Sequence, residues 1–234
     1  MEGKVAVVAT GARPVGRYGR QRLSPRRYVA TFGAAAQVGT LTYAAAVGLG
    51  GQDAREQIVL GDGAAWIKTQ AQWHFPDAVG ILDWAHVARA LHKAIRAARP
   101  GHAYRTLRRQ LHQAIPNALW HGDLETTLAA LRALRPPSAP PPASPAESPP
   151  ALEEAITYLH TQRAWLGNYA AWQDAGYPVG SGLIERAVAL VINRRMKRQG
   201  MRWRRENASA VVALRVRELN ATWAARDDAA RHAA

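Results

Sequence analysis

The chain has 234 residues, no cysteine, and 31 lysines and arginines against 17 acidic residues, which gives a formal charge of +14. This length suffices for one large domain or two small ones with a buried core, and one elaborated domain is the favoured interpretation. The lack of cysteine excludes disulfides and thiolate zinc sites. The positive charge favours a nucleic-acid partner. No run reaches the roughly 20 apolar residues that span a bilayer, and no signal-peptide pattern begins the chain. A soluble cytoplasmic protein with no membrane partner is therefore expected.

The first elements are predicted to be an antiparallel pair of strands followed by a helix. β-branched residues between glycines predict a strand over residues 4–10, and a second strand is predicted over residues 27–32. The stretch 11–25 is rich in Gly, Pro and Arg, which is typical of a basic loop or a wide hairpin. Residues 34–49 have apolar residues at helical spacing and predict a helix packed on these strands.

Two apolar runs further along the chain share one pattern, because each leads to an aspartate. Residues 57–60 precede Asp62, and residues 78–82 precede Asp83. The stretch 64–75 between them has helical spacing and is long enough for a crossover, so the two strands should be parallel, with their carboxyl ends on one edge. That edge is where open α/β sheets place their functional sites.

The rest of the chain is predicted to be helical apart from one linker. Residues 136–150 are too rich in proline for a helix or a sheet interior and predict an exposed, semi-rigid linker. Pro100 and Pro116 are expected to break the helical pattern, and Ser181 is a candidate N-cap. The predicted helices cover residues 86–99, 103–115, 122–134, 152–173, 180–197 and 206–225.

Three acidic residues could carry chemistry, and each also has a structural interpretation. Asp62 lies between two glycines after a strand and is a candidate metal ligand, but Asp-Gly is also a common turn pair. Asp83 and His86 have a spacing that could hold a metal or a phosphate, although Asp83 alone is more typical of a helix N-cap and His86 of a half-buried polar residue. Glu185 lies at the margin of an apolar helix face, where the helix dipole alone also favours an acid.

Taken together, these acids predict a site for hard divalent cations. Ligation by oxygen alone suits Mg²⁺ or Mn²⁺. Two such ions about 4 Å apart can activate a nucleophile and stabilise the leaving oxygen in a phosphodiester displacement. A trio of carboxylates is the set of ligands that this chemistry requires.

A dense basic cluster follows the helix that carries Glu185. Arginines and lysines neutralise phosphates, and the density of the cluster favours DNA over an ordinary solvated surface. Trp203 could stack on an unpaired base, but a place in the core is the favoured interpretation for this residue. The predicted DNA-binding residues are His86, Arg194, Arg195, Lys197, Arg198, Arg202, Trp203 and Arg204.

Four strings in this order resemble one family. They are LGDGAAWI at residues 60–67, HFPDAVGILDWAHVARAL at residues 74–91, YPVGSGLIERA at residues 177–187 and RRMKRQGMRW at residues 194–203. Together they closely resemble the ISKra-type insertion-sequence transposases of bacteria. The resemblance covers nearly the whole chain, and the ordered set is far more specific than any one string.

The resemblance implies a DDE transposase with a ribonuclease-H-like α/β fold, in which flanking helices cover a mixed sheet and an all-helical insertion separates the second Asp from the Glu. It implies a first part of the core at residues 1–99, an insertion at 100–176 and C-terminal core helices at 177–234. Asp62 matches the second catalytic acid and Glu185 the third, both as metal ligands. Asp83 and His86 match an Asp-x-x-His element that supports the site or positions DNA, and Asp83 remains a rival to Asp62 as the second acid.

The resemblance also implies that the family's first Asp lies on a strand before the first predicted strand of this chain. The chain is therefore expected to be an N-terminally truncated copy that is inactive alone. The implied partners are the DNA of transposon ends and target, in the nucleoid, and a homo-oligomer is compatible with them. A DNA-binding remnant without catalysis and a two-metal nuclease remain alternatives.

Overall fold

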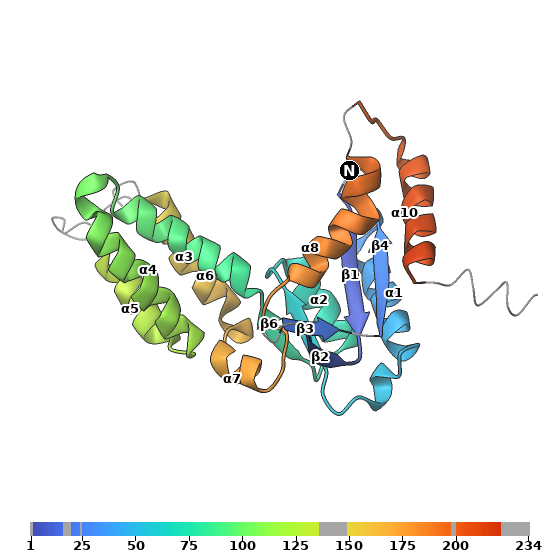
Figure 1. Ribbon diagram of the computed structural model, residues 1–234, viewed down its shortest axis with the longest axis horizontal. Helices are drawn as coiled ribbons and strands as arrows, with labels where there is room; N and C mark the ends of the chain where they lie inside the picture. The colour runs from blue at the N-terminus through green and yellow to red at the C-terminus, as the bar shows by residue number, and fades with distance from the viewer. Residues whose placement is uncertain (1, 16–19, 24, 136–148, 198–199, 221–234) are drawn as a thin grey trace, which may run out of the picture. The chain divides into compact units, whose positions relative to one another are not determined.

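The computed structural model describes residues 2–15, 20–23, 25–135, 149–197 and 200–220. The chain divides into two compact units. The first contains residues 1–57, 65–78 and 182–234, and the second contains residues 58–64 and 79–181. Both mix helices with short strands (Figure 1), so the predicted α/β class is confirmed at this level. None of the described helices combines the length and the apolar composition that a membrane-spanning segment requires.

The first unit begins with the predicted antiparallel strands. β1 (Lys4–Ala9) pairs with β4 (Arg26–Thr31), and a hairpin of β2 (Ala12–Val15) and β3 (Arg20–Leu23) lies between them in sequence. Alternate residues of a strand point to opposite faces. Tyr28 is therefore buried on one face of the β1–β4 pair and Val29 on the other.

Helices cover both faces of this pair. The predicted helix α1 (Ala35–Val47) packs on β1 and β4, and α2 (Ala65–His74) packs on α1. α8 (Gly182–Val188) packs on β1 and α10 (Arg205–Leu219) on β4. Ala187 of α8 and Val212 of α10 are buried with Val191, which follows α8, and with Tyr28 and Phe32. The remaining elements of the unit are η1 (Gly51–Asp53), η5 (Ala189–Asn193), which is a π-helix, and α9 (Arg194–Met196).

The second unit joins the two aspartate-bearing strands to a helical bundle. β5 (Ile58–Gly61) and β6 (Val79–Leu82) are parallel, as the sequence predicts, with Gly61 opposite Leu82. Figure 1 shows the bundle beside them. Its helices are α3 (Trp84–Ala98), α4 (Arg105–Trp120), α5 (Leu124–Ala133), α6 (Pro150–Gln162) and α7 (Tyr169–Asp174), with the turns η2 (His102–Tyr104) and η4 (Arg163–Trp165).

The structure corrects two of the predicted helices. Pro116 does not end its helix, because α4 continues to Trp120 with Pro116 buried beside Ile115 and Leu119. The free energy gained by burying the apolar ring offsets the cost of the backbone hydrogen bond that a proline cannot donate. The helix predicted over residues 152–173 is two helices, α6 and α7. Asn168 caps the second, since its side chain accepts from the Ala171 N–H at 2.9 Å.

Most of the predicted linker lies outside the described residues, but the residues beside it are held together. Arg135, two residues after α5, donates to both carboxylate oxygens of Glu153 on α6, at 2.8 and 2.6 Å. A bidentate pair of this kind fixes geometry as well as adding attraction. α5 and α6 are therefore tied to each other by side chains on either side of the proline-rich segment.

Candidate functional site

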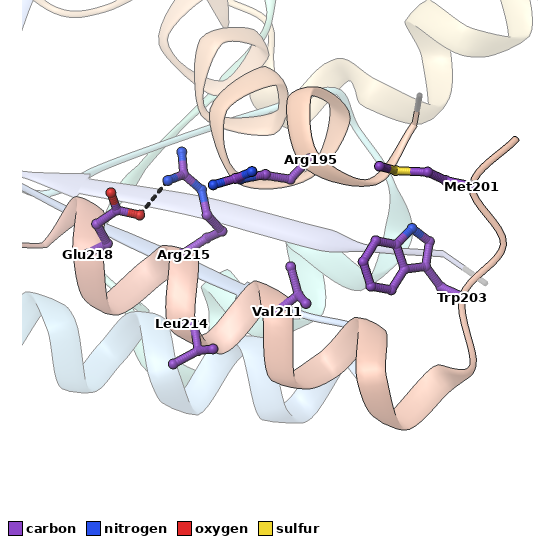
Figure 2. A pocket seen from close by; sticks show the side chains of 7 residues that line it. All are labelled: Arg195, Met201, Trp203, Val211, Leu214, Arg215 and Glu218. Atoms are coloured by element: carbon purple, nitrogen blue, oxygen red, sulfur yellow. Dashed lines mark hydrogen bonds and ion pairs between the residues drawn. The ribbon is translucent and has the colours of Figure 1, made fainter. Parts of the chain in front are cut away.

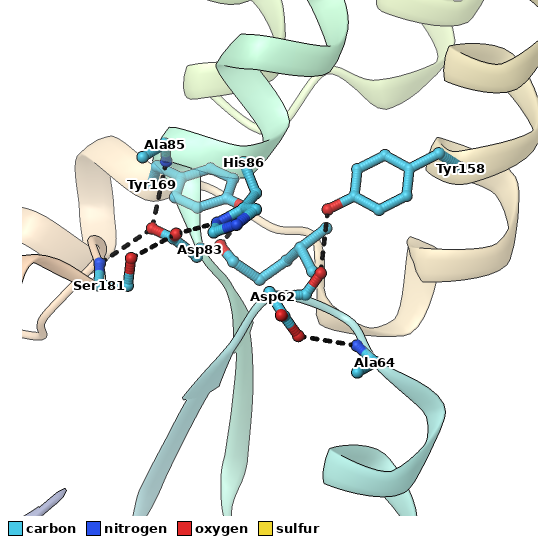
Figure 3. Close-up of polar contacts among 9 residues, drawn as sticks. Asp62, Ala64, Asp83, Ala85, His86, Tyr158, Tyr169 and Ser181 are labelled. Carbon is cyan, nitrogen blue, oxygen red and sulfur yellow. Dashed lines mark hydrogen bonds and ion pairs between the residues drawn. The ribbon is translucent and has the colours of Figure 1, made fainter. Parts of the chain in front are cut away.

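The carboxyl ends of β5 and β6 form the centre of the candidate site. The Asp83 N–H donates to the Gly61 carbonyl at 2.7 Å, which extends the parallel ladder by one residue. Asp62 and Asp83 therefore leave adjacent strands at the same edge, where the sequence predicts them to lie (Figure 3).

The Asp62 side chain is exposed to solvent. The Ala64 N–H donates to its Oδ1 at 3.0 Å, a local contact that holds the loop after β5. Figure 3 shows this carboxylate beside the Ala64 N–H. An exposed carboxylate on a short, anchored loop keeps oxygen available for an external cation or solvent.

Asp83 is completely buried, and hydrogen bonds surround its carboxylate. Oδ1 accepts from the N–H groups of Ser181 at 2.9 Å and Ala85 at 3.2 Å. Oδ2 accepts from the Ser181 hydroxyl at 2.6 Å and is in short contact with Nδ1 of His86. The contact with Ala85 confirms Asp83 as the N-cap of α3.

These contacts keep the buried Asp83 carboxyl ionised. Burial by itself raises its pKa, but the hydrogen bonds from the Ser181 side chain, His86, and the N–H groups of Ser181 and Ala85 outweigh burial and lower the pKa below its ordinary value of 3.8. A buried carboxylate so fully occupied by protein donors acts as a structural anchor for the segment that ends at Ser181. Trp84 adds to this anchor, because its N–H donates to the Val179 carbonyl at 3.0 Å.

Sequence reasoning missed the support that α6 gives to the loop after β5. The Tyr158 hydroxyl donates to the Asp62 carbonyl at 3.4 Å, and the Gln162 side chain donates to the Gly63 carbonyl at 3.0 Å. The two residues are four apart and so lie on one face of α6. That spacing is the only signal in the sequence, and nothing local links it to a loop roughly a hundred residues earlier.

Two tyrosines close to the aspartates remain neutral over the physiological range. Burial, together with the charges of Asp62 and Asp83, raises the pKa of Tyr158 to about 12. Burial also raises the pKa of Tyr169, whose hydroxyl donates to the Leu82 carbonyl at 2.8 Å. Both hydroxyls are therefore hydrogen-bond donors that fix the backbone around the two strand ends.

The other predicted site residues fall into two groups. His86 is with Asp83 in the second unit, and 37% of its side-chain surface is exposed. Glu185 belongs to the first unit, where it is exposed on α8. Within the described ranges, no three His, Asp or Glu side chains gather into a group that could hold a metal ion.

The basic cluster lies in the first unit, around α9 and the start of α10. Arg198 lies outside the described residues. Trp203 is half-buried against the core, and its indole N–H donates to the Met196 carbonyl at 3.2 Å, which agrees with the favoured interpretation of this residue. The exposed members of the cluster are Arg194, Arg195, Lys197, Arg202 and Arg204.

An apolar groove of about 630 Å³ borders this cluster (Figure 2). Trp203, Val211 and Leu214 form its apolar surface, and Arg215 with its ion-pair partner Glu218 lies at one end. Arg195 projects from α9 and is also among the lining residues. The sequence places the basic residues correctly at the surface but does not indicate the groove.

Comparisons of the chain with protein-family models, with curated proteins and with solved structures gave no match.

Proposed function

We propose that this chain carries the catalytic region of a DDE-type DNA transposase with a ribonuclease-H-like core, in which Asp62 and Glu185 are divalent-metal ligands. The observation that carries the proposal is the exposed Asp62 carboxylate at the carboxyl end of β5, beside the end of the parallel strand β6. This is the position at which open α/β sheets place their sites. The ordered motifs resembling ISKra-type transposases supply the reaction class.

The solvation of the two aspartates supports Asp62 rather than Asp83 as the metal ligand. A metal ligand needs a carboxylate oxygen that can face the ion. Asp62 is exposed, whereas both oxygens of the buried Asp83 already accept hydrogen bonds from Ser181, Ala85 and His86. Asp83 is therefore assigned a positioning role. It holds Ser181, which directly precedes α8 and its Glu185 in the chain.

The ligating atoms of the two carboxylates suit a hard cation. Both assigned ligands are carboxylates, the chain has no cysteine, and oxygen ligands suit Mg²⁺ or Mn²⁺. When bound, such ions would polarise the phosphodiester and promote in-line displacement. The chain's own residues orient the Asp62 carboxylate. Gln162 holds the backbone at Gly63, and the Ala64 N–H donates to the carboxylate itself.

Charge supports DNA as the substrate. The net charge of +14 attracts polyanions, and the exposed arginines of the basic cluster can neutralise backbone phosphates. If those arginines act without catalysis, the chain is instead a DNA-binding remnant. Binding to DNA would then be salt-dependent and indifferent to divalent metal.

Mn²⁺ binding tests the proposed ligands independently of turnover. Titrating the full chain with Mn²⁺ and following water-proton relaxation should detect binding that Asp62→Asn or Glu185→Gln weakens at least about tenfold, because each removes a charged ligand. Asp123→Asn is the matched control, since Asp123 is exposed and caps α5. Binding that is unchanged in the Asp62 and Glu185 variants would refute the assignment.

The DNA products identify the reaction class. With supercoiled plasmid, a labelled duplex and Mg²⁺, strand joining identifies a transposase, whereas nicking without joining identifies a two-metal nuclease. Any joining should disappear in Asp62→Asn and persist in Asp123→Asn. Joining that survives in Asp62→Asn would exclude the proposed role of this residue.

A further inference from the structure

The helical hairpin formed by α3 and α4 has an unusual charge distribution. No Asp or Glu occurs anywhere in residues 84–122, although the chain has 17 acidic residues. The same stretch carries Arg89, Lys93, Arg96, Arg99, Arg105, Arg108 and Arg109. Such segregation concentrates positive potential on one part of the second unit.

The charges lie on adjoining faces of the two helices. Residues three, four and seven apart share a helix face, so Arg89, His92 and Arg96 form one row on α3, and Arg105, Arg108, Arg109 and His112 form a second row on α4. α3 and α4 pack side by side (Figure 1). Arg89, Arg96, Arg105 and Arg109 are exposed, and in the described part of the chain none of these four has an ion-pair partner.

A pocket opens where the two rows meet. It has a volume of about 490 Å³ and is lined by Ala85, Ala88, Arg89, His92, Arg96 and His112. The small side chains of Ala85 and Ala88 leave space in the pocket, and the lining arginines and histidines offer hydrogen-bond donors. No acidic side chain is among the lining residues, so the pocket matches an anion and repels a cation.

The two histidines are in direct contact. Nδ1 of His92 lies 2.6 Å from Nδ1 of His112, so one ring must donate and the other accept. Burial lowers the pKa of both rings, and so do the positive charges of Arg96 and, for His112, of His92 and Arg108. Without an anion the pair therefore resists protonation.

We propose that the α3–α4 pocket binds a phosphate of a nucleic-acid backbone through Arg89 and Arg96, and that protonation of the His92–His112 pair tightens this binding. The row of Arg105, Arg108 and Arg109 continues along α4 and suits a polymer of phosphates better than a single ion. This surface is distinct from the basic cluster of the first unit and does not depend on the proposed metal ligands.

The affinity for phosphate should depend on pH because protonation of the histidines and binding of the anion are thermodynamically linked. A bound phosphate offsets the repulsion from Arg96 and Arg108, which raises the pKa of the histidines, and affinity must then increase as the pH falls. Charged residues of the neighbouring helices have other partners. Glu154 of α6 forms an ion pair with Lys93 at 2.9 Å, and Arg132 of α5 contacts His160. Because the pKa of both rings is lowered from the ordinary value of 6.5 before the anion binds, binding should strengthen mainly as the pH falls below about 6.5.

Fluorescence anisotropy of a labelled mixed-sequence duplex with the full chain in EDTA tests the surface. Arg96→Gln should weaken binding about threefold or more and lower the slope of log K against log salt by about 1. Lys93→Gln removes the same charge from the same helix, but Lys93 is paired with Glu154, so it should weaken binding less than twofold. Equal effects of the two substitutions would overturn the proposal. Because EDTA removes divalent metal, this result is independent of the proposed strand-transfer site.

The histidines are tested by the pH profile of the same assay at constant ionic strength. His92→Gln/His112→Gln should bind within about twofold of the parent at pH 7.5 but lose most of the gain at pH 5.5. A gain that persists in the double variant would contradict the proton linkage. NMR titration with inorganic phosphate separates the ligand sources: shifts at His92 and His112 with no effect of Arg96→Gln on duplex binding would identify a site for free anions and overturn the nucleic-acid assignment.

Discussion

Asp62 and Asp83 end neighbouring parallel strands, yet their surroundings are opposite. Asp62 is exposed and has one local hydrogen bond to Ala64, while Asp83 is fully buried and both its oxygens are occupied. The same local pattern, an apolar strand followed by an aspartate, therefore produced one carboxylate open to solvent and one structural anchor. The difference lies in what the rest of the chain brings to each strand end. Packing brings Ser181 to the side chain of Asp83, whereas the distant residues Tyr158 and Gln162 hold the Asp62 loop through its backbone carbonyls.

The largest effect is expected from Asp83→Asn. The amide loses the charge that Ser181, Ala85 and His86 stabilise and places an N–H₂ group where only donors point. Removing one side of such a buried network costs about 3 kcal/mol of unfolding free energy. Urea denaturation of the variant and of the parent measures the difference.

Asp62→Asn is the matched control for this experiment. Its side chain is exposed, and an asparagine oxygen can still accept from Ala64, so the free energy of unfolding should change by less than about 0.5 kcal/mol. Equal destabilisation by the two substitutions would mean that the two strand ends do not differ in the way the contacts indicate.

A smaller effect is expected at the support of the Asp62 loop. Gly63 has φ +88°, and a Cβ there would lie 2.7 Å from the Gln162 side chain and 2.9 Å from Leu82. Gly63→Ala should cost about 2 kcal/mol through left-handed strain and this crowding together. Gly50 is also left-handed, with φ +76° and ψ +22°, but has nothing within 4 Å of an added Cβ, so Gly50→Ala isolates the strain at about 1 kcal/mol. Thermal melts of both variants give the comparison, and a larger loss at Gly50 would contradict it.

A smaller effect than at Gly63 is expected from Ser181→Ala, which removes one hydrogen bond to Asp83 and leaves the N–H contact in place. A loss of about 1 kcal/mol is expected at pH 7. Because the folded-state pKa of Asp83 is lowered, the stability it confers is present above the ordinary value of 3.8 and is lost as the pH falls through the folded value. Ser181→Ala raises that folded value. Denaturation between pH 2 and 7 should therefore show the variant approaching the parent at low pH, and a constant difference would argue against a role through Asp83.

Local patterns predicted the elements that depend on short-range spacing. The antiparallel pair β1 and β4, the helix α1 and the parallel pair β5 and β6 follow from β-branched and apolar runs, helical spacing and crossover length. The capping interpretation of Asp83 was confirmed for the same reason, since a cap involves residues two or three apart.

The errors arose where tertiary packing competes with local preference. Pro116 is tolerated inside α4 because its position is buried in the bundle, and no local signal reports that. The break between α6 and α7 depends on Asn168 as a cap and on Trp165, which lies against Gly80 of β6 so closely that a Cβ there would meet its ring at 2.6 Å. The helical spacing of apolar residues in the sequence does not predict such distant contacts.

The sequence by itself determined the α/β class, the two aspartates at parallel strand ends and the concentration of positive charge, because these depend on spacing and composition alone. Tertiary structure decided which aspartate is open to solvent, since the partners of Asp83 come from residue 181 and those of the Asp62 loop from Tyr158 and Gln162. It also decided that His92 and His112, on different helices, share one basic pocket. The physical reason is the same in each case: burial and hydrogen bonding depend on neighbours in space, and those neighbours are set by packing between elements far apart in the chain.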